Sequence, residues 1–123
     1  ITLSYIAKLR HSTEMAEAED FHKIMIQAGT IIDVKSFPSA RVPTYQLYID
    51  FGKFGMKKSS ARITERYTMN ELLNKKILAV TNLPVKQIGN FFSECLVLGA
   101  PCSSGEIVLL TVCGEIHNGA FIH

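Results

Sequence analysis

Residues 52–59 (GKFGMKKS) contain the glycine, lysine and serine residues that phosphate-binding loops use. Such a loop needs a glycine directly before its Lys-Ser pair, and it must open a helix. Here Lys57 precedes Lys58 and Ser59, and the residues on both sides alternate as they do in strands. We therefore expect this segment to join two strands, and it predicts no nucleotide-binding loop.

The remaining nucleophiles and acids show no catalytic spacing. Residues 103–105 (SSG) predict a hairpin loop and lack the G-x-S-x-G pattern of a nucleophile elbow. Glu94 and Cys95 are adjacent, and adjacent strand residues point to opposite faces, so they would not act on one substrate atom. The four histidines lack metal-ligand spacing, and the three cysteines form no CxxC pair, so we expect reduced thiols. The sequence predicts no enzyme, no metal site and no cofactor.

Positive charge is concentrated in residues 53–76, although the whole chain carries a formal net charge of only +2. This window has seven basic and two acidic residues, a balance of +5. Such a concentration is the first electrostatic sign of a polyanionic partner such as nucleic acid. A plain solvated surface gives the same pattern, so charge alone leaves both interpretations open. The basic residues are Lys53, Lys57, Lys58, Arg62, Arg66, Lys75 and Lys76.

Short strands are the elements that would position these groups. Residues 44–51 alternate most clearly, with Leu47 and Ile49 on one face and Gln46 and Tyr48 on the other. Apolar or β-branched runs bounded by turn residues indicate further strands. These expected strands are residues 29–35, 56–64, 77–80, 95–98 and 107–112.

A short helix is expected between the third and fourth strands, because Thr68 and Glu71 form a capping box. One helix at that point suits a five-stranded Greek-key barrel of the oligonucleotide-binding (OB) type, although periodicity also permits a sandwich. We predict an all-β fold, a five-stranded OB barrel with short helices at the flanks and between strands 3 and 4. Residues 118–119 (NG) predict a tight turn late in the chain.

Residues 1–20 are expected to form a separate N-terminal extension, helical from Glu14 with Ser12 or Thr13 as the cap. Residues 21–123 would then form a single domain. The chain has no run of the roughly 18 apolar residues that a membrane-spanning helix needs, and no signal peptide is recognisable. We expect no membrane insertion and a cytoplasmic localisation.

Residues 56–64 (MKKSSARIT) resemble a segment of the CsaA-type secretion chaperones, which belong to a wider group of tRNA-binding domains. The resemblance extends in order over residues 21–123. This chain departs from the family at Gln87, where a second basic residue is usual, and at Phe92, where a lysine is usual. Further matching segments are residues 37–43 (FPSARVP), 49–52 (IDFG), 82–84 (NLP) and 93–99 (SECLVLG).

This resemblance implies an OB barrel that forms a homodimer and has no catalytic activity. It implies a CsaA-like protein-export chaperone that binds unfolded or precursor polypeptides and also tRNA. The alternative is a stand-alone tRNA-binding module that assists an aminoacyl-tRNA synthetase. The loss of family basic residues favours the chaperone, and the positive window favours the tRNA module.

Ten residues are candidates for these two kinds of binding. Lys57 and Lys58 fall on opposite strand faces, so only one can join a single surface at that level. Arg41 could clamp a ligand or a dimer mate, and Asn82 and Ser93 could instead serve turn and strand-end geometry. Of the adjacent phenylalanines, one is expected in the core and the other exposed. The tRNA or phosphate candidates are Lys57, Lys58, Ser59, Arg62, Asn82, Lys86 and Ser93, and the peptide candidates are Arg41, Phe91 and Phe92.

Overall fold

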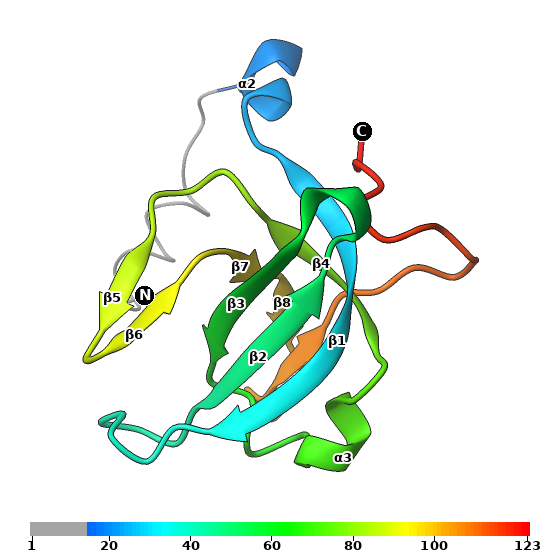
Figure 1. The fold of residues 1–123 in the computed structure, drawn as a ribbon. Coiled ribbons are helices and arrows are strands. Elements are labelled where there is room, and N and C mark those ends of the chain that lie inside the picture. Colours follow the sequence, from blue (N-terminus) through cyan, green and yellow to red (C-terminus); the bar gives the residue numbers. More distant parts are fainter. Residues whose placement is uncertain (1–14) are drawn as a thin grey trace.

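The computed structural model describes residues 15–123 (Figure 1). The expected helix cap at Ser12 or Thr13 lies outside these residues, as does most of the proposed extension. In the described part, helix α2 (Ala18–His22) is shorter than expected. Its N-cap residue is Glu17, whose backbone N–H donates to Asp20 Oδ2 at 2.9 Å. No helix within residues 15–123 has the length and apolar character needed to cross a membrane.

The barrel is a five-stranded antiparallel sheet that closes almost completely on itself, which confirms the OB-like fold (Figure 1). Its strand order is β3-β2-β1-β4-β7. Closure between β3 and the chain before β7 comes from Glu94 N–H, which donates to the Lys58 carbonyl at 2.8 Å. The barrel strands are β1 (Ile26–Ser36), β2 (Tyr45–Asp50), β3 (Met56–Ala61), β4 (Lys76–Val80) and β7 (Leu96–Val97).

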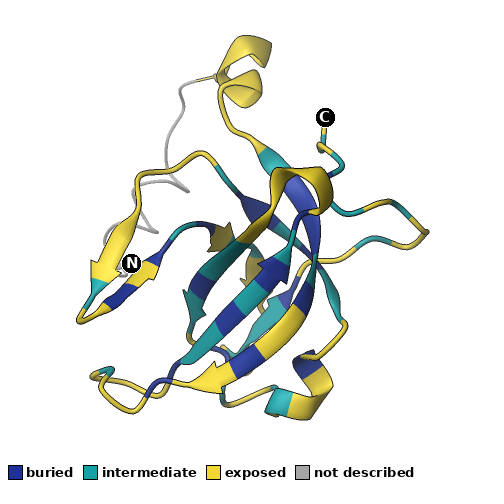
Figure 2. Cartoon of the chain, viewed as in Figure 1, coloured by how far each residue is buried: buried dark blue, intermediate teal, exposed yellow. Residues whose placement is uncertain are grey.

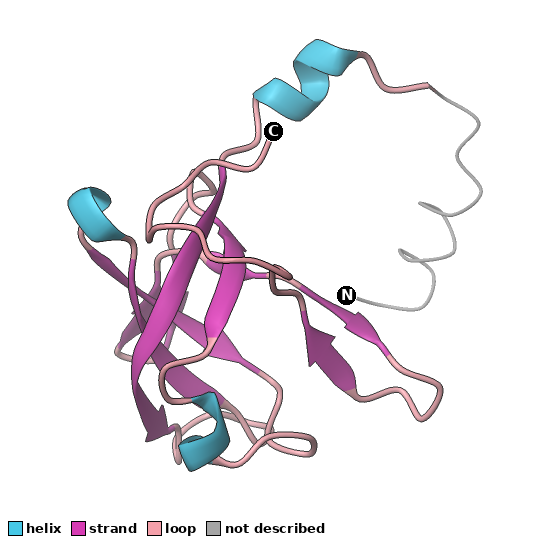
Figure 3. Ribbon diagram, turned by 90° about the vertical axis from the view of Figure 1, so that its right-hand side faces the viewer, coloured by secondary structure: helices cyan, strands magenta, loops and turns pink. Residues whose placement is uncertain are grey.

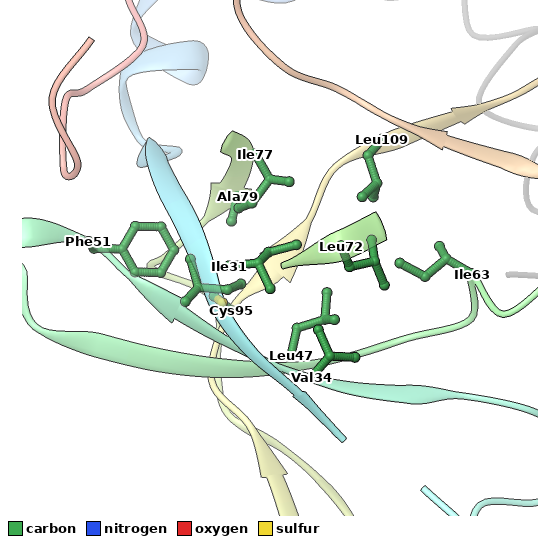
Figure 4. Close-up of a cluster of buried hydrophobic side chains, with 11 residues drawn as sticks. Ile31, Val34, Leu47, Phe51, Ile63, Leu72, Ile77, Ala79, Cys95 and Leu109 are labelled. Atoms are coloured by element: carbon green, nitrogen blue, oxygen red, sulfur yellow. The ribbon is translucent and has the colours of Figure 1, made fainter. Parts of the chain in front are cut away.

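The alternation of apolar residues explains why these strands surround one core. On β2, Leu47 and Ile49 are fully buried while Gln46 and Tyr48 are half-exposed, as the sequence predicted (Figure 2). The buried side chains converge inside the barrel from β1, β2, β4 and the α3 helix (Figure 4). Phe51 closes one end of this core, and Leu72 lies among the side chains at the other (Figure 4).

Helix α3 (Met69–Leu72) lies between β3 and β4, where the capping box predicted it. Thr68 N–H donates to Glu71 Oε1 at 3.1 Å, and Glu71 N–H donates to Thr68 Oγ1 at 3.3 Å. This helix places the fully buried Leu72 against the core. A one-turn 3-10 helix, η1 (Gly52–Phe54), makes the turn from β2 to β3.

Two hairpins lie outside the five-stranded sheet; sequence reasoning missed the first, whereas residues 103–105 predicted the hairpin loop of the second. The first joins β5 (Lys86–Ile88) to β6 (Phe91–Ser93) and projects from the barrel beyond β3 (Figures 1 and 3). The second joins β8 (Gly99–Pro101) to β9 (Ile107–Leu109). The expected strand at 107–112 therefore ends at Leu109, because the chain leaves the hairpin there.

The last residues run beside β1 rather than forming a hairpin of their own. Gly119 N–H donates to the Ala28 carbonyl at 2.7 Å, and Ala28 N–H donates to the Ala120 carbonyl at 2.9 Å. The expected turn at residues 118–119 is present, with Gly119 at a φ of 92°. Residues 117–122 and the first half of β1 are called the closing end below.

Candidate functional site

The outward side chains of β1, β2 and β3 form one polar surface, called the outer face below. Directly opposed residues of an antiparallel sheet share a face, as do residues two apart. The strand register therefore places two rows of three side chains side by side on this surface. The first row is Lys35, Gln46 and Ser60, and the second is Asp33, Tyr48 and Lys58.

Two flanking segments turn this surface into a concave one. The 37–44 loop between β1 and β2 borders one end, and the β5–β6 hairpin borders the β3 side (Figure 1). The pairs Lys86–Ser93 and Ile88–Phe91 lie on one side of the hairpin, and Gln87–Phe92 lies on the other. The side that carries Lys86 and Ile88 faces the outer face, because both residues line a hollow together with Ser60 of β3.

The cationic hollow lies between the 37–44 loop, β3 and β5. It has a volume of about 460 Å³, and three basic side chains line it: Arg41, Arg62 and Lys86. No carboxylate is among its lining residues, and within residues 15–123 none of the three cations makes a salt bridge. Three like charges gathered without a counter-charge attract an anion. The concave shape strengthens this attraction, because a cleft lined by one sign of charge focuses the electric field.

The aromatic hollow continues the outer face toward the hairpin tip and has a volume of about 410 Å³. It is lined by Ser39, Gln46, Tyr48, Lys58, Asn90 and the phenylalanines at 37 and 91. Tyr48 Oη donates to Gln46 Oε1 at 3.4 Å. The Lys35 ammonium lies 4.9 Å from the centre of the Tyr48 ring, and that of Lys58 lies 5.2 Å from the Phe91 ring. These distances allow cation–π attraction, which orients both aromatic rings.

A small apolar hollow of about 220 Å³ lies on the other side of Lys86 and contains Leu83, Pro84 and Leu96. It shares Ser60 and Lys86 with the cationic hollow. Cys95 lies in its floor, where burial raises the pKa of the thiol to about 12. Cys95 is therefore a packed, neutral thiol at pH 7. Because the thiolate is the reactive form of cysteine, Cys95 is not a nucleophile there.

Five of the ten candidate residues meet at the cationic and aromatic hollows. Arg41, Arg62 and Lys86 line the first, and Lys58 and Phe91 line the second. Arg41, which the sequence assigned to peptide binding, therefore lies beside two residues assigned to phosphate.

The structure separates Lys57, Ser59 and Phe92 from these hollows. Lys57 and Ser59 lie on the β3 face opposite Lys58, so the predicted alternation is confirmed. Ser59 is 1% exposed, and its hydroxyl donates to the Ser60 carbonyl at 3.0 Å, so it does not reach a ligand on the surface. Phe92 is 45% exposed and lies on the hairpin side that faces away from the outer face.

Phe91 and the two remaining candidates, Asn82 and Ser93, make contacts that stabilise the fold. Phe91 is buried and packs on Phe37 with a ring separation of 5.3 Å, so the expectation of one buried and one exposed phenylalanine is confirmed. Ser93 Oγ accepts a hydrogen bond from Ser60 N–H at 3.1 Å. Asn82 accepts from Met25 N–H and donates to the Lys23 carbonyl, both at 2.8 Å. Asn82 thus ties the chain before β1 to the β4–β5 connection.

Sequence reasoning missed Gln46, Tyr48 and Asn90, which line the aromatic hollow. The alternation on residues 44–51 carried a signal for the first two, because it leaves a polar and an aromatic side chain on the outward face. Asn90 gave no such signal, since only the hairpin pairing brings it to the same surface. Among the described residues, no group of three His, Cys, Asp or Glu side chains could hold a metal ion.

Comparisons with known proteins identify the family to which this chain is similar. A family model described as a putative tRNA binding domain matches residues 26–120. The crystal structure of the chaperone CsaA from Bacillus anthracis str. Ames is 44% identical with a TM-score of 0.84, over 89% of this chain and 100% of that one. The CsaA chaperone of Picrophilus torridus is 49% identical with a TM-score of 0.83, with the same coverage.

A longer relative is the methionine–tRNA ligase of Pyrococcus horikoshii. It is 34% identical over 108 residues, which is 87% of this chain and 14% of the ligase. The chain therefore spans only about one seventh of the length of the curated relatives it matches, so the likeness concerns one part of those enzymes.

Proposed function

The chain belongs to the tRNA-binding domain family, and from this premise we propose that it binds tRNA without acting on it chemically. The observation that carries the proposal is the cationic hollow, with Arg41, Arg62 and Lys86 and no carboxylate in its lining. The family match over residues 26–120 includes all three cations. The outer face of strands 2 and 3 and the loops beside it are also where OB barrels hold oligonucleotides.

Electrostatics supports phosphate as the group that this hollow takes. Two arginines offer planar donor forks that match phosphate oxygens, and Lys86 adds a flexible point charge. Each phosphate neutralised releases condensed counterions, which makes binding strongly salt-dependent. Contacts of this kind position the nucleic acid and carry no sequence information by themselves.

A second proposed function is that of a chaperone for unfolded or precursor polypeptides. It is supported by the apolar hollow and by the likeness to two CsaA chaperones at 44% and 49% identity. Leu83 and Leu96 are about half-exposed there and could take an apolar side chain of a client. We place both activities in the cytoplasm, where tRNA and precursors awaiting export are found.

We also propose that the protein is a homodimer. Phe54 and Phe121 pack edge to face with a ring separation of 5.2 Å at the closing end, and both are more than 40% exposed. A second copy would remove this aromatic pair from water. Sedimentation equilibrium should then give twice the 13.7 kDa chain mass at micromolar concentration, and the monomer mass would contradict the proposal.

The test of tRNA binding is a titration of bulk tRNA across a salt series. Three phosphate contacts predict a slope of log K against log salt of about −2 to −3, or roughly a 20- to 40-fold loss between 50 and 200 mM salt. Replacing Arg62 and Lys86 together by alanine should flatten the slope by about 1.5. Lys53→Ala is the matched control, because Lys53 lies on η1, away from the hollow. Salt-independent binding, or equal slopes for all variants, would contradict the proposal.

The chaperone function is tested by suppression of aggregation of a denatured protein. Leu96→Ser removes apolar surface from the small hollow and should weaken polypeptide binding about fivefold. Because the apolar and cationic hollows share Ser60 and Lys86, added tRNA should compete with the client. Phe92→Ser is the control on the far side of the hairpin. Equal effects of the two serine variants would exclude the apolar hollow as the polypeptide site.

A further inference from the structure

We propose that the aromatic hollow is a nucleobase subsite. An unstacked base from a single-stranded part of an RNA would stack on Tyr48 and form hydrogen bonds with the amides of Gln46 and Asn90. The adjoining phosphates would lie in the cationic hollow. The proposal rests on the proposed tRNA binding and adds base selectivity to it, which phosphate contacts alone do not supply.

The two hollows are consecutive parts of one strand face. Thr44 lines the cationic hollow, whereas Gln46 and Tyr48 line the aromatic one. These side chains lie two residues apart on the same face of one segment, a step of roughly 7 Å. Gln46 is also directly opposite Ser60, which belongs to the cationic hollow. A chain of nucleotides can therefore pass from one hollow to the next without leaving the outer face.

The side chains of the aromatic hollow have free capacity for a planar polar ligand. Within residues 15–123 the Asn90 amide makes no hydrogen bond, and the Gln46 amide makes only the one it accepts from Tyr48. The half-exposed Tyr48 ring is held by Lys35 at 4.9 Å. A base offers a flat π-face for the tyrosine and a polar edge for the amides, which is the chemistry these groups match.

Charge along the outer face separates the base end from the phosphate end. Asp33 is paired across the strands with Tyr48, so at the aromatic end one carboxylate partly offsets the two lysines there, Lys35 and Lys58. Three cations without a carboxylate lie at the other end. A phosphate is therefore attracted more strongly to the second place than to the first, whereas a neutral base has no such preference and can occupy the first. A polypeptide has no regular alternation of anion and flat ring, so the arrangement favours a nucleic acid.

Amide side chains also predict which base binds more tightly. An amide presents a donor and an acceptor side by side, and this pattern complements N6 and N7 of adenine. Adenine further presents a larger face for stacking than uracil does. We therefore expect oligo(A) to bind about fivefold or more tightly than oligo(U) of equal length.

The test measures binding of fluorescent eight-nucleotide oligo(A) and oligo(U), with bulk tRNA as reference, to the full chain and four variants. Tyr48→Leu should weaken oligo(A) binding by about five- to 150-fold, which is the measured value of one base stack. Gln46→Ala should reduce the preference for oligo(A) to the part that comes from stacking on Tyr48. Arg62→Ala should weaken both oligomers equally, because it contacts phosphate. Phe92→Leu removes an exposed aromatic ring outside the hollow and should change neither.

Each outcome distinguishes the subsite from the general function. Equal affinities for oligo(A) and oligo(U), with Tyr48→Leu unchanged and Arg62→Ala weakened, would overturn the subsite and leave tRNA binding intact. A preference for oligo(A) that Gln46→Ala leaves undiminished would also overturn it. If neither the oligomers nor tRNA binds, the proposed function fails as well. If an acidic peptide binds through Tyr48 and Gln46 while the oligomers do not, the occupant is a polypeptide and the proposal is wrong.

Discussion

Two lysines, Lys76 on β4 beside the closing end and Lys86 on the β5–β6 hairpin, show how differently this protein uses one residue type. Lys76 Nζ donates to the Ile116 carbonyl at 2.9 Å and to Asn118 Oδ1 at 2.7 Å. Lys86 is exposed and, within the described part of the chain, makes no hydrogen bond or salt bridge through its side chain. The ammonium of Lys76 donates its hydrogen bonds within the fold, whereas that of Lys86 can donate to a ligand.

The same contrast extends to the regions around these lysines. At the closing end, Asn118 accepts from Thr30 Oγ1 at 2.7 Å, and the buried Gln27 Nε2 donates to the Gly119 carbonyl at 3.1 Å. Polar groups there satisfy one another, and within residues 15–123 no buried side-chain N or O atom lacks a partner. In the cationic hollow, three cations gather without a carboxylate in the lining. Satisfied polar groups stabilise a fold, whereas gathered like charges without partners bind an anion.

The largest expected effect comes from a single methyl group at the closing end. In Gly119→Ala the new Cβ would lie 2.4 Å from the Phe51 carbonyl oxygen, at a φ of 92° that L residues rarely adopt. We expect a loss of about 3 kcal/mol or more in the free energy of unfolding and a fall in Tm of about 10 °C or more. Gly89 on the β5–β6 hairpin also has a positive φ, but a Cβ there would meet no atom within 4 Å. Gly89→Ala should therefore lower the free energy of unfolding by only about 1 kcal/mol. Equal costs in urea denaturation would contradict the tight packing at Gly119.

Exchanging the two lysines for methionine tests the contrast directly. Lys76→Met leaves the Ile116 carbonyl without its donor and should cost about 1–3 kcal/mol of stability, with tRNA affinity unchanged. Lys86→Met should change stability by less than about 0.5 kcal/mol, because its side chain is exposed. It should instead flatten the salt slope of tRNA binding by about 0.7–0.9. Thermal unfolding and tRNA titration of both variants measure this; a reversed pattern would show that the structural assignment of the two lysines is wrong.

The pH dependence of stability tests whether water reaches the Cys95 thiol in the floor of the apolar hollow. The pKa of the Cys95 thiol is about 12 in the folded protein, above its value near 8.5–9 in an unfolded chain. The unfolded state therefore loses its proton first, and the stabilisation that is complete below pH 8.5 declines as the pH rises toward 12. Between pH 9 and 10, wild type should lose about 1 kcal/mol more than Cys95→Ala does. Parallel losses in urea denaturation at the two pH values would mean that water reaches Cys95.

The smallest expected effect is at Gln87 on β5. Gln87 is paired with Phe92 on the hairpin side that faces away from both hollows. A charge added there by Gln87→Arg is exposed and screened by salt, so tRNA affinity should change by no more than about twofold at 150 mM salt. Gln46→Arg places the same charge on the outer face and is the matched comparison. A clear gain from Gln87→Arg alone would place the tRNA on the other side of the hairpin.

Local patterns in the sequence determined the barrel strands and the helix that packs beneath them. The alternation on residues 44–51 defined which side of β2 is buried, because side chains of a strand alternate with a period of two. The Thr68–Glu71 capping box likewise defined the start of α3, because both of its hydrogen bonds join residues three apart. Features that depend on neighbours along the chain can be read from the chain itself.

The assembly of the site was decided by tertiary structure alone. Arg41, Arg62 and Lys86 come from a loop, the end of β3 and a projecting hairpin, and they meet because barrel closure brings the hairpin beside β3. The sequence could rank these residues as cations but could not separate them from Lys57, whose charge is the same and whose strand face is different. Nor could it show that Lys76 is held by the closing end, since its partners are 40 and 42 residues away. Charge is a property of each residue, whereas its availability depends on which distant groups the fold brings within hydrogen-bonding distance.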